Sequence, residues 1–136
     1  MTALQMTDGM QRWWQEHSEL DALVERVVEA LGRGAISPVA ESLEDLAGTL
    51  EAHFGIEESA YFPLVERLSP SQHAALDAAR LGHRKIRERL EDLRELVENG
   101  DLRAARAALD VLLDRFRAHE VEEAKLIARL EQLAAT

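Results

Sequence analysis

Hydrophobic residues recur at spacings of three and four along almost the whole chain. Examples are Leu20, Leu23, Val24, Val27 and Leu31, followed later by Leu43, Leu46 and Leu50. This spacing places apolar side chains on one face of an α-helix, and no stretch shows the strict alternation that indicates a β-strand. The pattern therefore predicts an all-α protein.

Glycine and proline are concentrated where the periodic segments stop. The segment Gly32–Pro38 combines a glycine-rich helix end with Ser37 as a helix N-cap and Pro38 as the first helical residue. Leu68–Gln72 contains a second start signal, and Glu98–Asp101 contains an Asn-Gly helix end followed by Asp101 as an N-cap.

These breaks divide the chain into four predicted helices, at about 9–33, 38–68, 71–98 and 102–134. Short connections between long helices favour antiparallel neighbours. We therefore predict an up-down-up-down four-helix bundle, a single domain over residues 1–136. Pro63 lies inside the second helix, where it removes a backbone hydrogen bond and clashes with the preceding turn, so a kink or local distortion is expected about one turn beyond Glu57.

The histidines follow a repeat. The interval from His17 to His53 equals the interval from His83 to His119. The shift along the sequence that superimposes the first pair on the second also superimposes Glu57 on Glu123. Apolar positions such as Leu20 and Ile86 coincide under the same shift. The chain therefore reads as two copies of one helical hairpin.

Distances from the predicted turns place the histidines in one layer. Position 35, in the first turn, is midway between His17 and His53, and Asp101, in the third connection, is midway between His83 and His119. Position 68, at the second connection, is midway between His53 and His83. In an antiparallel bundle equal distance from a shared turn means equal height, here roughly 27 Å from the first and third connections at about 1.5 Å per residue.

Glu57 and Glu123 lie one helical turn beyond His53 and His119 on the same faces, so both carboxylates are expected near the layer. Buried carboxylates are costly unless a positive charge compensates them, and a bound metal provides one. Each metal of a pair could take two imidazoles, with the carboxylates bridging. The predicted ligands are His17, His53, Glu57, His83, His119 and Glu123. A nitrogen and oxygen set suits iron, manganese, zinc or cobalt, and carboxylate bridges with open positions favour two irons.

Other polar and aromatic residues near the layer have plainer interpretations. Glu58 and Glu122 point off the histidine faces and are expected to be solvated, and His73 lies near a helix start and is expected to be exposed. Trp13, Trp14 and Tyr61 are expected to pack in the core; the alternative is that they wall off the site, with the Tyr61 hydroxyl near an open coordination position.

Composition narrows the possible partners. The chain of 136 residues has a formal net charge of −10, which argues against nucleic acids and anionic membranes as partners. The absence of cysteine excludes disulfides and thiolate ligands. The start of the chain does not resemble a signal peptide, and no apolar run is long enough to span a bilayer, so a cytoplasmic protein is expected.

Four motifs together resemble the hemerythrin-like, or HHE cation-binding, family: WWQEHSEL around His17, HFGIEESAYFP from His53, LGHRKI around His83 and AHEVEEAKLI around His119. The resemblance implies a four-helix bundle that holds an oxo- or hydroxo-bridged di-iron centre, with manganese or zinc as possible substitutes. It also implies that the four histidines are terminal ligands and that Glu57 and Glu123 are bridges.

The sequence departs from the oxygen-carrier hemerythrins, in which the third helix has an HxxxH motif and the fourth helix has an HxxxxD motif. Ala79 and Arg87 occupy the one-turn positions on either side of His83, and Ala124 stands where the aspartate would be. Reversible oxygen carriage is therefore not expected. The variant is more similar to HHE proteins associated with iron or oxygen sensing, or with peroxide and nitric oxide handling.

The expected function is that of a non-heme di-iron protein that binds O2, peroxide or NO in the bundle core. The first alternative is an iron- or redox-responsive sensor without turnover, and the second is a metal-free helical interaction domain. The sequence leaves open whether the protein is an enzyme, and it identifies no catalytic residue and no oligomeric state.

Overall fold

The computed structural model describes the backbone of residues 3–135 and the side chains of residues 11–133. The described part is helical, with the element order α1 (Ala3–Arg33), α2 (Ile36–Ile56), a π-helical turn (Glu57–Tyr61), α3 (Phe62–Leu68), a 3-10 turn (Pro70–Gln72), α4 (His73–Glu98) and α5 (Leu102–Ala135). The all-α prediction is confirmed.

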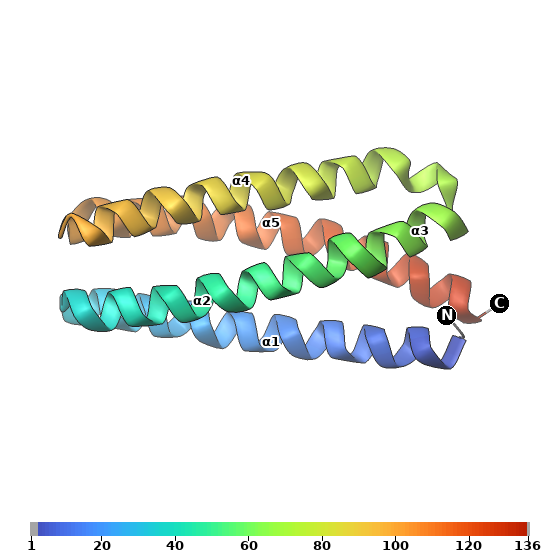
Figure 1. The fold of residues 1–136 in the computed structure, drawn as a ribbon, viewed down its shortest axis with the longest axis horizontal. Helices are drawn as coiled ribbons and strands as arrows, with labels where there is room; N and C mark the ends of the chain where they lie inside the picture. The colour runs from blue at the N-terminus through green and yellow to red at the C-terminus, as the bar shows by residue number, and fades with distance from the viewer. Residues whose placement is uncertain (1–2, 136) are drawn as a thin grey trace.

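The long helices form two hairpins that pack side by side (Figure 1). α1 packs against α2, and α4 packs against α5; α1 also contacts α5, and α2 also contacts α4. Each long helix is therefore antiparallel to both of its neighbours, and both chain ends lie at the same end of the bundle as α3 (Figure 1). This arrangement is the predicted up-down-up-down bundle.

The turns at the opposite end of the bundle, at Gly34 and Gly100, contain some of the predicted helix-ending and helix-capping residues. Gly34 and Gly100 have φ angles of 72° and 76°, the left-handed conformation that glycine supplies after a helix. Asp101 caps α5, because its carboxylate accepts a hydrogen bond of 3.1 Å from the backbone N–H of Ala104.

The predicted Ser37 cap is wrong. α2 begins at Ile36, and Ala35 is its N-cap without a side-chain hydrogen bond. The first backbone N–H groups of a helix have no partner within it, so Pro38 fits into the first turn and does not mark its start. α1 also begins earlier than predicted, at Ala3. The helix continues through Gly9, at the predicted start, because one glycine in a helix costs only about 1 kcal/mol.

The second predicted helix is interrupted, as Pro63 suggested. The distortion is a π-helical turn over Glu57–Tyr61, closed by a hydrogen bond from the N–H of Phe62 to the carbonyl of Glu57. It begins at Glu57 itself and not one turn beyond it. The wider turn relieves the clash that the Pro63 ring would make in a regular helix.

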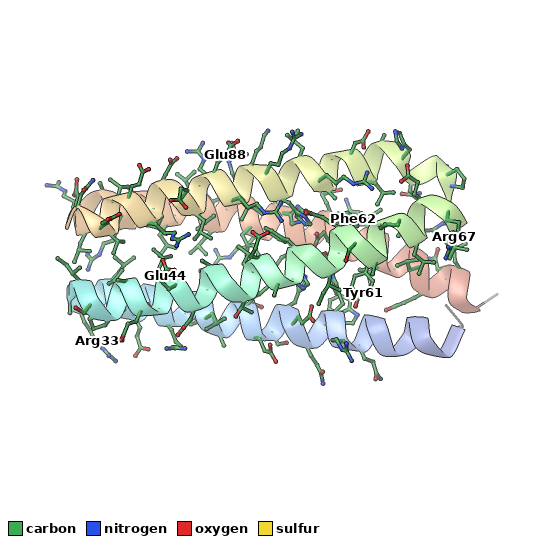
Figure 2. All side chains as sticks on the ribbon, in the orientation of Figure 1. Arg33, Glu44, Tyr61, Phe62, Arg67 and Glu88 are labelled. Atoms are coloured by element: carbon green, nitrogen blue, oxygen red, sulfur yellow. The ribbon has the colours of Figure 1, made fainter. Side chains whose placement is uncertain are left out.

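The hydrophobic core consists of two clusters. One, toward the Gly34 and Gly100 turns, includes Leu20, Leu50, Leu93 and Phe116. The other, toward the chain ends, includes Trp13, Phe62, Leu76 and Leu130. Charged side chains such as Glu88 and Arg33 project from the outside of the bundle (Figure 2). Among the described residues, none of the helices combines the length and apolar character that crossing a bilayer requires.

Candidate metal centre

The six predicted ligand residues are brought together in the interior of the bundle. α1, α2, α4 and α5 each contribute one histidine, and the two glutamates follow on the π-helical turn and on α5. All six side chains are buried: His17, His53, Glu57, His83, His119 and Glu123. The histidines share one layer because the turns set equal heights on antiparallel helices, as the spacing predicts.

The first group joins α1 and α2. The Nε2 atoms of His17 and His53 lie 2.9 Å apart. His53 Nε2 is 3.1 Å from Glu57 Oε1, and His17 Nε2 is 3.7 Å from Glu123 Oε1. One potential ligand atom from each of these four residues lies within 4.8 Å of the others, so the group could hold one metal ion.

The second group joins α4 and α5. Glu123 Oε2 lies 2.8 Å from His83 Nε2 and 2.7 Å from His119 Nε2. These three residues also form a group that could hold a metal ion. Glu57 Oε1 approaches this group as well, at 3.4 Å from His83 Nε2. Both carboxylates therefore lie between the two histidine pairs.

Two buried oxygens in this layer have no hydrogen-bond partner, Glu57 Oε1 and Glu123 Oε1. Imidazole nitrogens lie 3.1 and 3.7 Å away, without the geometry of a hydrogen bond. Buried polar atoms are rarely left unsatisfied in proteins. Two unsatisfied carboxylate oxygens among four imidazoles therefore fit a bound metal pair, which would use these lone pairs.

Without metal, protons compensate the charges of the layer. Burial by itself lowers the pKa of His17, but its hydrogen bonds to Glu120 and Glu123 outweigh this effect and raise the pKa to about 9. Burial is likewise outweighed at His83, where three nearby glutamates raise the pKa to about 9.

The other titrating groups divide between protonated and unprotonated forms. Burial raises the pKa of Glu57 to about 8. Burial, together with the neighbouring charge of His17, lowers the pKa of His53. Burial would also raise the pKa of Glu123, but hydrogen bonds from the histidines around it hold that pKa well below its usual value. A metal bound in this layer would therefore displace protons.

Three further glutamates orient the histidines. Glu120 Oε2 is 2.9 Å from His17 Nδ1, Glu16 Oε2 is 2.7 Å from His53 Nδ1, and Glu58 Oε2 is 2.9 Å from His83 Nδ1. A carboxylate at Nδ1 holds the proton there and leaves Nε2 free to bind a metal.

These three glutamates were not predicted from the sequence, and the prediction that Glu58 is solvated is wrong. Glu58 is only partly exposed, because the π-helical turn directs it toward His83 and Arg87. A signal for two of them was present: Glu16 and Glu120 directly adjoin a histidine, so each lies at the height of the layer.

The family comparison agrees with this geometry. The family model described as "Hemerythrin HHE cation binding domain" matches residues 8–130. The chain belongs to the hemerythrin HHE family. The searches of curated proteins and of solved structures found no match.

Aromatic residues enclose this hemerythrin-type centre. The indole N–H of Trp13 donates a 3.0 Å hydrogen bond to Glu57 Oε2, and its ring lies 3.8 Å from that of His17. Phe54 stacks on His83, with ring centroids 3.8 Å apart. Trp13 is thus both core and part of the site. Trp14 is 49% exposed, so the prediction that it packs in the core is wrong. Tyr61 is buried in the same core cluster as Trp13, and this burial raises its pKa.

The remaining residues singled out by sequence lie where they were expected or are engaged elsewhere. His73 is exposed and pairs with Glu66, outside the layer. Glu122 is exposed and pairs with Lys125. Arg87 forms ion pairs with Glu51 on α2 and with Glu58 on the π-helical turn. Ala79, one turn before His83, is buried and leaves that position without a ligand side chain.

Proposed function

We propose that this hemerythrin-family protein binds two iron ions in the bundle core and uses them to bind O2, peroxide or NO. His17 and His53 would hold one ion, His83 and His119 the other, and Glu57 and Glu123 would bridge them. The observation that carries the proposal is the pair of buried, unsatisfied carboxylate oxygens between two histidine pairs.

An iron pair bound here would supply Lewis acidity and electrons that the side chains lack. The chain's own residues prepare the site for it. Glu16, Glu58 and Glu120 hold protons at Nδ1 and keep the Nε2 atoms aimed inward. Trp13 donates to one oxygen of Glu57 and thereby orients its other oxygen toward the histidines.

The departure at Ala79 supports small-ligand binding. Neither residue one turn from His83 is a histidine, and the buried one, Ala79, carries only a methyl group, so a metal near His83 would have fewer protein ligands and room for an external one. The aromatic rings of Trp13 and Phe54 line the histidines and limit the entry of bulk water. These features favour a ligand of two or three atoms over a larger substrate.

Metal analysis and an optical spectrum between about 300 and 700 nm test the proposal directly. Protein loaded with iron(II) without oxygen and then exposed to air should contain two irons per chain and absorb in this range. His119→Ala should lose bound iron, whereas the matched variant His73→Ala should retain it, because His73 is exposed and distant from the centre. Colourless, iron-free wild-type protein after this loading would refute the proposal.

The second candidate function is an iron- or redox-responsive sensor. It is favoured by the origin of the ligands: one histidine comes from each of the four long helices, so metal binding would tie all of them together. Sensing predicts a large iron-dependent rise in melting temperature with no turnover. Fast peroxide decay that is lost in His119→Ala would favour an enzyme instead.

A further inference from the structure

One histidine of the centre lacks the support that the other three have. Glutamates contact Nδ1 of His17, His53 and His83. Among the described residues, no hydrogen-bond partner contacts Nδ1 of His119, which is held through Nε2 by Glu123.

The internal repeat shows where that support is missing. Under the shift that relates the two hairpins, His53 corresponds to His119, and Glu16, the residue that holds His53, corresponds to Gly82. A Cβ atom added at Gly82 would lie 2.5 Å from His119 Nδ1. Position 82 therefore adjoins the His119 ring, as position 16 adjoins His53, but it supplies no carboxylate.

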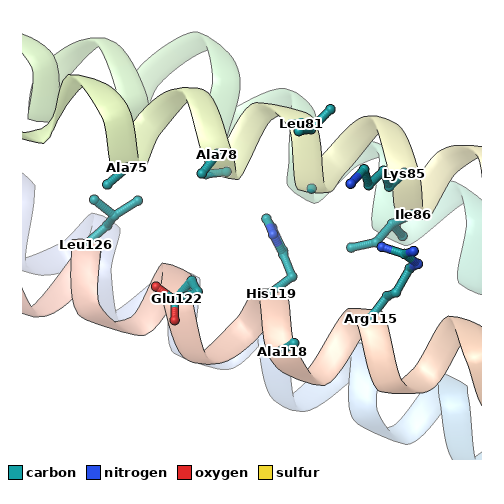
Figure 3. Close-up of a pocket in the computed structure, with 12 residues that line it drawn as sticks. Ala75, Ala78, Leu81, Lys85, Ile86, Arg115, Ala118, His119, Glu122 and Leu126 are labelled. Carbon is teal, nitrogen blue, oxygen red and sulfur yellow. The ribbon is translucent and has the colours of Figure 1, made fainter.

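A cavity of about 310 Å³ lies on this side of His119, between α4 and α5 (Figure 3). Small residues line much of it, including Ala75, Ala78, Gly82 and Ala118. The imidazole of His119 projects from α5 into the space between the two helices (Figure 3). The cavity thus reaches the ring whose Nδ1 is unsupported.

We propose that His119 is the releasable ligand of the centre and that the α4–α5 cavity admits the external ligand to the metal held by His83 and His119. This inference rests on the proposed function, because it assumes two bound metals. An unsupported imidazole loses less on leaving the metal than one tied to a carboxylate, since no second hydrogen bond has to break. The small side chains around it leave space for the ring to turn.

Charge at the cavity suits a small anionic or neutral ligand. Lys85 and Arg115 lie in its lining, near Ile86 (Figure 3). Glu122 also lines it, but its carboxylate is paired with Lys125. In a chain with a formal net charge of −10, this combination makes the cavity a locally favourable place for an anion such as azide.

The first test follows metal release. Protein loaded with two equivalents of iron(II) under anaerobic conditions is mixed with excess chelator, and the coloured iron complex is recorded over time. We expect two phases of one equivalent each, separated by about 10- to 100-fold in rate, because losing an orienting partner typically lowers metal affinity by about this factor and weaker binding here means faster release. Azide binding to the oxidised protein is followed separately by its absorbance change.

Filling the cavity should act on one phase only. Ala118→Leu should slow the fast phase and slow azide binding, because the larger side chain occupies the space into which His119 turns. Ala52→Leu is the matched control, since Ala52 is the repeat equivalent of Ala118 and is also exposed. Ala78→Leu, which fills the cavity from α4, is the second variant if Ala118→Leu fails to fold by circular dichroism.

The reciprocal variant is Glu16→Ala, which removes the support of His53 and should accelerate the slow phase toward the fast one. A single release phase, or equal behaviour of Ala118→Leu and Ala52→Leu, would overturn the inference while leaving two bound metals and the proposed function intact. Acceleration of the fast phase by Glu16→Ala would also overturn it, by assigning that phase to His53. Failure to bind two equivalents would refute the proposed function itself, and the inference with it.

Discussion

Metal binding by this protein should be strongly coupled to pH between 7 and 9. In the metal-free layer, His17 and His83 have pKa values raised to about 9, and Glu57 has one raised to about 8. Each of these three groups therefore carries a proton at pH 7 that a metal must displace. His53, whose pKa is lowered, and Glu123, whose pKa lies well below its usual value, contribute none.

The magnitude follows from linkage between protons and metal. The release of three protons means that the combined affinity for two metals rises by up to about three powers of ten per pH unit near pH 7, or about 4 kcal/mol. The dependence should flatten above pH 9, where the three groups are already deprotonated. Isothermal titration with zinc in several buffers at pH 7, together with proton release measured in weakly buffered solution, gives the number directly.

Stability of the metal-free protein should change in the opposite direction. The folded-state pKa values of His17, His83 and Glu57 are raised above their unfolded values, so the folded state holds more protons. The stability contributed by the two histidines is complete below about pH 6.5 and is lost as the pH rises through about 9. The contribution of Glu57 is complete below about pH 4.5 and is lost as the pH rises through about 8. The melting temperature without metal should therefore fall from pH 7 to 9, while the rise on adding zinc grows. Release of fewer than one proton per chain at pH 7, or a melting temperature that increases over this range, would refute the reasoning.

Three substitutions test individual contacts. Trp13→Phe removes the indole N–H that is bonded to the buried side chain of Glu57, and it should lower the free energy of unfolding in urea by about 1–3 kcal/mol without metal. Trp14 is half-exposed, so Trp14→Phe should change this free energy by less than about 0.5 kcal/mol. Equal effects of the two variants would contradict the importance of the Trp13 hydrogen bond. Gly82→Ala places a Cβ 2.5 Å from Nδ1 of His119 and should reduce bound iron to below two per chain. A Cβ at Gly48 would have nothing within 4 Å, so Gly48→Ala should leave the iron content unchanged. Full iron content in Gly82→Ala would show that the His119 ring adjusts freely. Tyr61→Phe should alter the visible spectrum and azide kinetics of the iron protein if the hydroxyl lies near the open coordination position, and identical spectra and kinetics would exclude that role.

Much of the fold and the six residues of the layer could be predicted from sequence because both depend on counting. A helix advances by a constant rise per residue, so equal distances from shared turns place His17, His53, His83 and His119 at one height. The duplicated spacing also identified Glu57 and Glu123 as the carboxylates on the same faces. The prediction of Ser37 as an N-cap was wrong because a serine-proline pair can stand either at the start of a helix or inside its first turn.

What the sequence by itself determined is the level of each residue along the bundle and the face of the helix it occupies. Only the tertiary structure decided which of the 26 acidic residues turn toward the histidines, since this depends on helix rotation and on the π-helical turn at Glu57. Glu16, Glu58 and Glu120 reach three imidazoles through contacts between different helices, and Gly82 leaves the fourth unsupported beside a cavity. The height of a residue in the bundle depends only on how many residues separate it from the end of its own helix, whereas contacts between helices depend on how the whole bundle packs.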